Sequence, residues 1–125
     1  LRSKILNNKI NIKKLERIIH PLVRKEMKNF SRKNKDKKML FYEIPLLIES
    51  KLMNYFDIIV FIKAKKEIRL KRFKSKGGDK KLFNLLNNKQ LPDSQKGKLC
   101  NHVVVNEKNL TILKKNLLDI IKLYE

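Results

Sequence analysis

Two short apolar runs constrain the fold of this chain more than any other feature. Residues 57–62 and 102–105 are rich in β-branched side chains and show little polar alternation. Continuous hydrophobicity over the length of a strand is typical of parallel strands that are covered on both faces. Helical patterns lie between and after these runs. The sequence therefore predicts an α/β fold with a parallel sheet.

A third apolar run, residues 39–44, ends at Pro45 and is predicted to be another buried strand. The following residues, 46–56, are too many for a hairpin and fit a crossover with a short helix. Three strands are few for a sheet that is buried on both faces. We therefore expect residues before Leu1, or a partner, to complete the sheet, and the chain to be part of a longer protein.

The N-terminal third is predicted to be helical. Apolar residues recur at helical spacing over residues 11–30, and His20-Pro21 interrupts the pattern. Because proline favours the first turn of a helix, we expect two helices, over about residues 11–19 and 21–32.

Helices are also predicted between and after the last two strands. Residues 65–76 form one, which Gly77-Gly78 ends, and Asp79 is placed to cap the next over about residues 80–90. A loop containing Pro92 and Gly97 follows. Asn106 or Asn109 then caps a final amphipathic helix.

The net charge of +20 invites a nucleic-acid interpretation, but its composition argues against one. Of the 32 basic residues 26 are Lys and 6 are Arg, and they are spread along the whole chain. Proteins that read phosphates and bases rely on the bidentate fork of Arg. We favour compositional bias, and keep a basic nucleic-acid-binding module as an alternative that nucleic-acid binding with a steep salt dependence would reveal.

Several other classes of function lack their sequence signals. Cys100 is the single cysteine, so it cannot form an internal disulfide, and no Cys/His cluster has metal-ligand spacing. No apolar run approaches the ~20 residues that span a bilayer, and a cytoplasmic location is expected. The three glycines do not form a G-x-x-x-x-G-K-[ST] phosphate loop.

A row of cations is the first candidate site. Lys65, Arg69, Arg72 and Lys76 are spaced to share one helical face, and this face leads to Gly77-Gly78. Cations beside a hinge would suit a lid that closes over a triphosphate. A solvated face is the alternative.

Two other positions are candidates. Glu43 lies at the carboxyl end of a predicted strand, where open α/β sheets bind ligands, and could contact Mg²⁺ directly or through water. His20 faces either a substrate phosphate or the backbone at a helix boundary.

Taken in order, these segments resemble the dephospho-coenzyme A kinase family. The resemblance spans essentially the whole chain and is most specific at its "HP" and "PLL.E" pieces. The segments that carry it are Leu1-Arg2, Leu15-Glu16, Ile19-His20-Pro21-Leu22-Val23, Glu43-Ile44-Pro45-Leu46-Leu47-Ile48-Glu49-Ser50, Leu70-Lys71-Arg72 with Lys76, Gln90-Leu91-Pro92 with Lys96, and Leu99-Cys100-Asn101 with Val103 to Asn106.

The resemblance implies transfer of the γ-phosphate of ATP, with Mg²⁺, to the ribose 3′-hydroxyl of dephospho-coenzyme A. The implied fold is an incomplete P-loop NTPase-like three-layer α/β/α domain: residues 1–38 form a helical substrate region, 39–64 core strands, 65–98 a lid region, and 99–125 the last strand and C-terminal helix. No membrane or nucleic-acid partner is implied, and the oligomeric state is left open.

The resemblance also implies roles for individual residues. Arg72, Lys76 and Glu43 are expected at the phosphoryl-transfer centre, with Glu43 reaching the metal, if at all, through water. Asn106 and Arg72 are expected to contact the nucleotide. The expected substrate contacts are Arg2, His20 and Glu49.

The chain departs from the family pattern at several places. Glu43 replaces the usual Asp, Lys76 the second lid Arg, and Cys100-Asn101 the usual Ala-Asp. The family's phosphate loop and the catalytic carboxylate after it are absent from these residues, so we expect the segment alone to be inactive. A degenerate paralogue that acts as an interaction protein is a further alternative.

Overall fold

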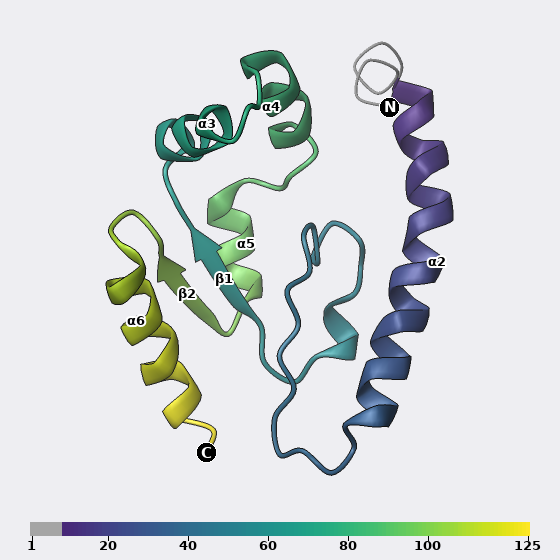
Figure 1. The fold of residues 1–125 in the computed structure, drawn as a ribbon, viewed down its shortest axis with the longest axis vertical. Helices are drawn as coiled ribbons and strands as arrows, with labels where there is room; N and C mark the ends of the chain where they lie inside the picture. The colour runs from purple at the N-terminus through teal and green to yellow at the C-terminus, as the bar shows by residue number, and fades with distance from the viewer. Residues whose placement is uncertain (1–8) are drawn as a thin grey trace. The chain divides into compact units, whose positions relative to one another are not determined.

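The computed structural model describes residues 9–125, with side chains from Lys13 onward. The chain divides into two compact units, Leu1–Ile44 and Pro45–Glu125, which are described separately. The first unit contains the helix α2, and the second contains a short sheet with the helices α3 to α6 (Figure 1).

The first unit is built on one long helix. α2 runs without a break from Lys9 to Lys33 and includes Pro21, so the predicted division into two helices is wrong. Proline lacks the N–H that would donate to the carbonyl four residues earlier, at a cost of about 3 kcal/mol inside a helix. This loss affects one position in 25 residues, and α2 remains continuous because the other turns keep their backbone bonds.

The run at residues 39–44 follows α2 but is not a strand, contrary to the prediction. Phe41 is 65% exposed, whereas Tyr42 packs edge-on against Phe30 with a centroid distance of 5.3 Å. Within the described residues no strand pairs with this run. A high β propensity does not suffice, because a strand is stabilised by its neighbours in the sheet.

The second unit is organised by two parallel strands. β1 (Val60–Lys63) pairs with β2 (His102–Val105) so that Val60 lies opposite His102 and Lys63 opposite Val105. Both strands and their parallel pairing were predicted. Among the described residues the sheet has two strands instead of the three expected.

The sheet lies between two helices. Paired residues of neighbouring strands point to the same face: Phe61 and Val103 point toward α5 (Asp93–Leu99), where the Lys96 ammonium lies 5.6 Å from the Phe61 ring centroid. His102 points to the other face, and its Nε2 lies 2.6 Å from the Tyr124 hydroxyl, just after α6 (Leu110–Lys122). The two-stranded sheet therefore has α5 in contact with one face and the end of α6 in contact with the other.

Coverage of this sheet is only partial. Val104 is 4% exposed, but its neighbours Val103 and Val105 are 45% and 51% exposed. The expectation of strands buried on both faces is therefore wrong for β2, because the two helices that contact the sheet leave part of it open.

The segment between residues 45 and 59 is a set of tight turns. The 3₁₀ helix η1 (Met53–Tyr55) is the short helix expected in this connection. Leu46 and Lys51 adopt positive φ angles of 57° and 58°, which are uncommon outside glycine. Leu52 is buried beneath these turns at 5% exposure.

Helices α3 (Lys66–Ser75) and α4 (Lys80–Asn87) pack together through Phe73 and Phe83, whose ring centroids lie 5.8 Å apart. As predicted, the Gly77-Gly78 pair ends α3, with Gly77 at φ +82°, and the Asp79 carboxylate caps α4 by accepting from the Leu82 N–H at 2.8 Å. Gly78 lies directly against the Phe73 ring. Gly78 therefore makes this turn a packed corner, whereas nothing lies within 4 Å of a Cβ built on Gly77.

The predicted Pro92/Gly97 loop is the helix α5 instead. Pro92 is the N-cap residue, where its missing N–H costs nothing, and Gly97 faces Val103 inside the helix. Of the two proposed caps of α6, Asn109 is the one used: its Oδ1 accepts from the Ile112 N–H at 3.0 Å.

We predict that Gly78→Ala destabilises the second unit by about 1–3 kcal/mol, because the new methyl group would overlap the Phe73 ring and force α3 and α4 apart. Gly97→Ala is the matched control. A Cβ there would meet Val103 at an ordinary 3.7 Å, so this helical substitution should be neutral or stabilising. Urea unfolding followed by circular dichroism measures both. Equal stability of the two variants would contradict the packed corner.

Candidate functional site

The carboxyl ends of β1 and β2 bring together two of the predicted site residues. The Arg72 guanidinium, on α3, donates from Nη1 to the main-chain carbonyl of Asn106 at 2.7 Å. Beside them, the Glu107 carboxylate accepts from the Lys65 N–H at 3.0 Å. Ligands of open α/β sheets bind at this edge of the strands.

The row of cations on α3 does not act as one solvated face. Arg69 donates from Nε to the Ala64 carbonyl at 3.1 Å and from Nη1 to Asn87 Oδ1 at 2.9 Å. Like Arg72, it ties α3 to the residues that follow a strand. Lys65 and Lys76 are instead the residues that flank α3, and their side chains are exposed.

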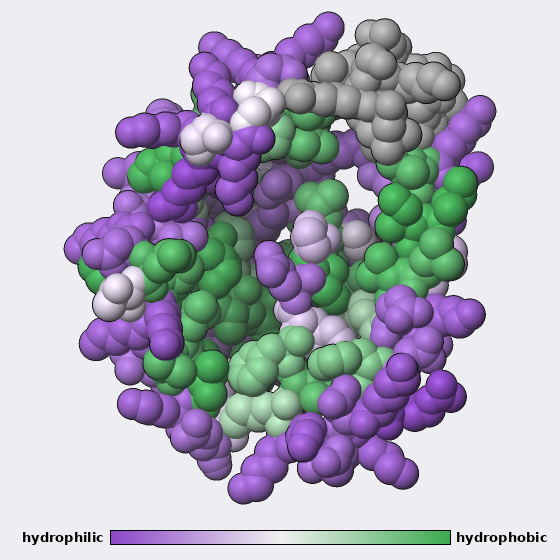
Figure 2. Space-filling view, in the orientation of Figure 1, coloured by the Kyte–Doolittle hydropathy of each residue, from purple (hydrophilic) through white to green (hydrophobic). Residues whose placement is uncertain are grey.

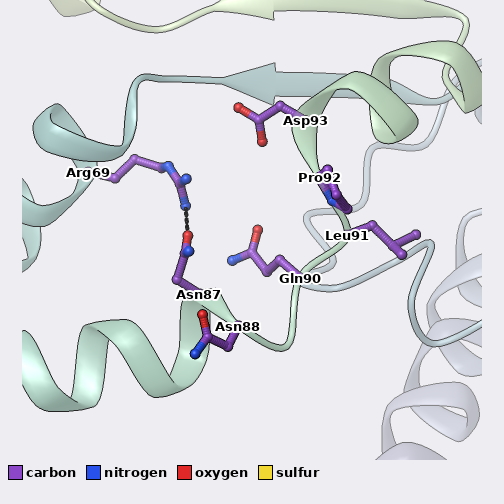
Figure 3. A pocket seen from close by; sticks show the side chains of 7 residues that line it. All are labelled: Arg69, Asn87, Asn88, Gln90, Leu91, Pro92 and Asp93. Carbon is purple, nitrogen blue, oxygen red and sulfur yellow. Dashed lines mark hydrogen bonds between the residues drawn. The ribbon is translucent and has the colours of Figure 1, made fainter.

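A pocket of about 360 Å³ opens beside Arg69. Figure 3 shows the Arg69–Asn87 hydrogen bond on one side of it and the side chains of Gln90 and Asp93 on the other. The residues that line it come from α3, from the last residue of α4, from the connection to α5 and from the first residue of α5: Arg69, Asn87, Asn88, Gln90, Leu91, Pro92 and Asp93. The wall is therefore mostly amide and charged groups, suited to a polar ligand.

Beneath this stretch lies a buried ion pair that the sequence did not reveal. Lys96 Nζ lies 2.9 Å from Glu49 Oε1, and the two side chains are 8% and 12% exposed. The same ammonium donates to Gln90 Oε1 at 2.8 Å, and the same Glu49 oxygen accepts from the Leu91 N–H at 2.9 Å. The motif pieces containing Glu49 and Lys96 were noted, but spacing alone could not pair residues 47 positions apart.

This environment shifts two titratable groups. Burial alone would raise the pKa of Glu49, but the hydrogen bonds from Lys96 and the backbone, with the lysine charge, outweigh burial and lower it. Burial raises the pKa of the Cys100 thiol, and the nearby Lys96 charge opposes this only in part. Glu49 is thus held as a carboxylate, while Cys100 is held as a thiol.

The remaining predicted site residues belong to the first unit. Arg2 lies outside the described residues. His20 is half-buried on α2, and Glu43 is exposed at the end of that unit. Within residues 9–125 there is no cluster of three or more His, Cys, Asp or Glu side chains that could hold a metal ion.

Asn101, where the family pattern has Asp, connects the start of β2 to the residue before β1. Its Oδ1 accepts from the Ile59 N–H at 2.7 Å, while its own N–H donates to the Ile59 carbonyl at 2.9 Å. An amide oxygen serves here as well as a carboxylate oxygen, so the register of β1 against β2 does not need the negative charge.

Comparison with known proteins decides the family. A family model described as dephospho-CoA kinase matches residues 1–111, most of the chain. The chain belongs to the dephospho-CoA kinase family. The family is one of transferases that use ATP in coenzyme A biosynthesis.

Dephospho-CoA kinases of several bacteria are similar to this chain. That of Wolbachia pipientis is 32% identical over 96 residues, which are 75% of this chain and 49% of the relative. That of Rickettsia typhi is 31% identical over 119 residues, or 94% and 62% of the two chains. That of Bartonella quintana is 34% identical over 112 residues, or 86% and 57%. The chain spans about half the length of the curated relatives it matches.

No solved structure matches this dephospho-CoA kinase family member significantly. None of the helices in its described part is both long enough and apolar enough to cross a membrane.

The lowered pKa of Glu49 predicts how stability changes in acid. A carboxyl group whose pKa is lower in the folded state binds fewer protons there than when unfolded. Its contribution is therefore complete above the ordinary value of 4.5 and is lost as the pH falls through the lowered pKa. We expect urea unfolding between pH 6 and pH 3 to show this loss. Glu49→Gln should have a flatter pH profile, and an unchanged slope would contradict the ion pair.

Proposed function

We propose that the full-length protein transfers the γ-phosphate of ATP to the ribose 3′-hydroxyl of dephospho-coenzyme A in the cytoplasm. The residues of this chain contribute the lid, one edge of the nucleotide site and part of the substrate region. The observation that carries the proposal is the contact of Arg72 with the Asn106 carbonyl at the carboxyl end of β2, in a chain of this family.

Arg72 is the proposed catalytic cation. Its guanidinium has five N–H donors in a planar fork, and the contact with Asn106 accounts for one of them. The others can bind phosphate oxygens of ATP as negative charge shifts between the reacting groups. Asn106 would then contact the nucleotide beside it. Lys76, beyond the last turn of α3, would add a second, more mobile positive charge.

The carboxylates have proposed roles of their own. Glu43 acts near the phosphoryl group and reaches Mg²⁺ through water. Glu49 contacts dephospho-coenzyme A through Oε2, because its Oε1 is already shared by Lys96 and the Leu91 N–H. Arg2 and His20 are the other proposed substrate contacts.

The chain lacks the amides of a glycine-rich phosphate loop, which stabilise the triphosphate in this class of enzyme. The 125-residue chain alone should therefore give no turnover. The test compares it with the chain preceded by the residues encoded upstream. ADP release should require dephospho-coenzyme A and appear only in the longer protein; a longer protein that produces no coenzyme A would refute the proposal.

In that longer protein, Arg72→Ala should reduce kcat by about 10²–10³, with a smaller change in the KM for ATP, because the cation acts mainly on developing charge. Arg72→Lys should recover only part of kcat, since lysine lacks the planar fork. The control is Lys74→Ala, which removes an exposed cation from the same helix. A kcat for Arg72→Ala within twofold of the unmodified protein would exclude this role.

A further inference from the structure

Lys96 stands apart from the other lysines of this Lys-rich chain because it is buried. It is 7% exposed and belongs to α5, on the face that contacts β1. An ammonium group pays a large desolvation penalty unless it is paired and hydrogen-bonded. Here its partners are the Glu49 carboxylate, the Gln90 side-chain oxygen and the Phe61 ring. Because Lys96 is buried, it does not serve solubility as an exposed lysine does, and its position calls for another explanation.

The partners of Lys96 come from separate parts of the second unit. Glu49 lies in the turns bounded by Leu46 and Lys51, which the Ser50 N–H closes by donating to the Leu46 carbonyl at 2.9 Å. Gln90 and Leu91 belong to the connection between α4 and α5, residues 88–92. The Glu49 carboxylate and the Lys96 ammonium each bond to this connection, one through its backbone and one through a side chain. They therefore fix it at two points.

The α3–α4 pair is attached to the sheet at its two ends. At the first end, Arg69 bonds to the Ala64 carbonyl, directly after β1. At the second end stands the connection 88–92, which the Glu49–Lys96 pair holds. This connection also forms much of the pocket wall that faces Arg69 (Figure 3). Where the second end lies decides how α3 presents Arg72 to the edge of the sheet.

We propose that Lys96 and Glu49 are positioning residues of this kinase, which fix the second attachment of the lid helices α3 and α4. The proposal rests on the proposed function for the role of Arg72 in phosphoryl transfer. Lys96 itself touches no substrate. It acts through Glu49, Gln90 and Leu91, and its removal lets the connection and α4 shift relative to β1.

Ion pairs of this kind are often no more stabilising than an apolar pair of the same size, whereas removal of one partner is costly. A purely structural role and a positioning role therefore predict different activities for one variant, in which both members of the pair are replaced. Lys96→Met leaves a buried carboxylate without its partner, and Glu49→Gln with Lys96→Met removes that charge as well. If stability alone mattered, the double variant would recover activity along with stability.

The experiment uses the longer protein with the upstream residues. Lys96→Met should lower kcat/KM for ATP at least tenfold, since small displacements of catalytic groups have effects of about this size or larger. The double variant should regain thermal stability but not kcat/KM. Glu49→Gln alone keeps an oxygen for both hydrogen bonds but alters a proposed substrate contact, so it is the reference for the double variant, and both are assayed at saturating dephospho-coenzyme A.

A second measurement does not depend on activity. Hydrogen exchange at the amides of residues 88–92 and of α4 should accelerate in Lys96→Met, while exchange in β2 stays unchanged. Lys98→Met is the matched control, because it removes an exposed lysine from the same helix.

Three results would overturn the inference: unchanged exchange at residues 88–92, unchanged kcat/KM in Lys96→Met, or recovery of kcat/KM in the double variant to the level of Glu49→Gln alone. An inactive unmodified protein would instead refute the proposed function. In that case the exchange data would still decide whether Lys96 holds the connection.

Discussion

The parallel pairing of β1 with β2 is the constraint on which the second unit depends. Parallel neighbours cannot be joined by a hairpin, so the chain that leaves β1 after Lys63 must return to the opposite end of the sheet before His102. The whole of α3, α4 and α5 is this return path (Figure 1). Helices α3 and α4 follow directly where the chain leaves the sheet, and α5 covers part of one face on the way back.

This arrangement explains which parts of the fold could be predicted. Features set by local chemistry were found: the β-branched runs of β1 and β2, the Asp79 cap, the glycines after α3 and the Asn109 cap. The predictions that Pro21 divides a helix and that Pro92 and Gly97 form a loop were wrong. Pro21 is tolerated within a long helix, while Pro92 begins α5. Residues 39–44 have strand propensity, but the described part of the chain offers them no neighbouring strand.

The candidate site was predictable to a similar extent. The family resemblance implied that Arg72 and Asn106 share the nucleotide site, and the Arg72 guanidinium does donate to the Asn106 carbonyl. The Glu49–Lys96 pair joins a turn to a helix that was itself predicted as a loop. Periodicity describes one element at a time, so it could not show this contact. The net charge was no guide either, since most of the basic residues are exposed and those that organise the second unit are Arg69, Arg72 and Lys96.

The chemistry of these three cations suits their places. The arginines reach carbonyl oxygens at the carboxyl edge of the sheet and keep further donors for a ligand, as their fork allows. At the α4–α5 connection an apolar contact would exclude water equally well, but it would have no preferred direction. The buried ammonium requires two oxygens at hydrogen-bonding distance, and one of them is anchored in the turns after Pro45. A directional pair can therefore fix the position of the connection after α4, even where its net contribution to stability is small.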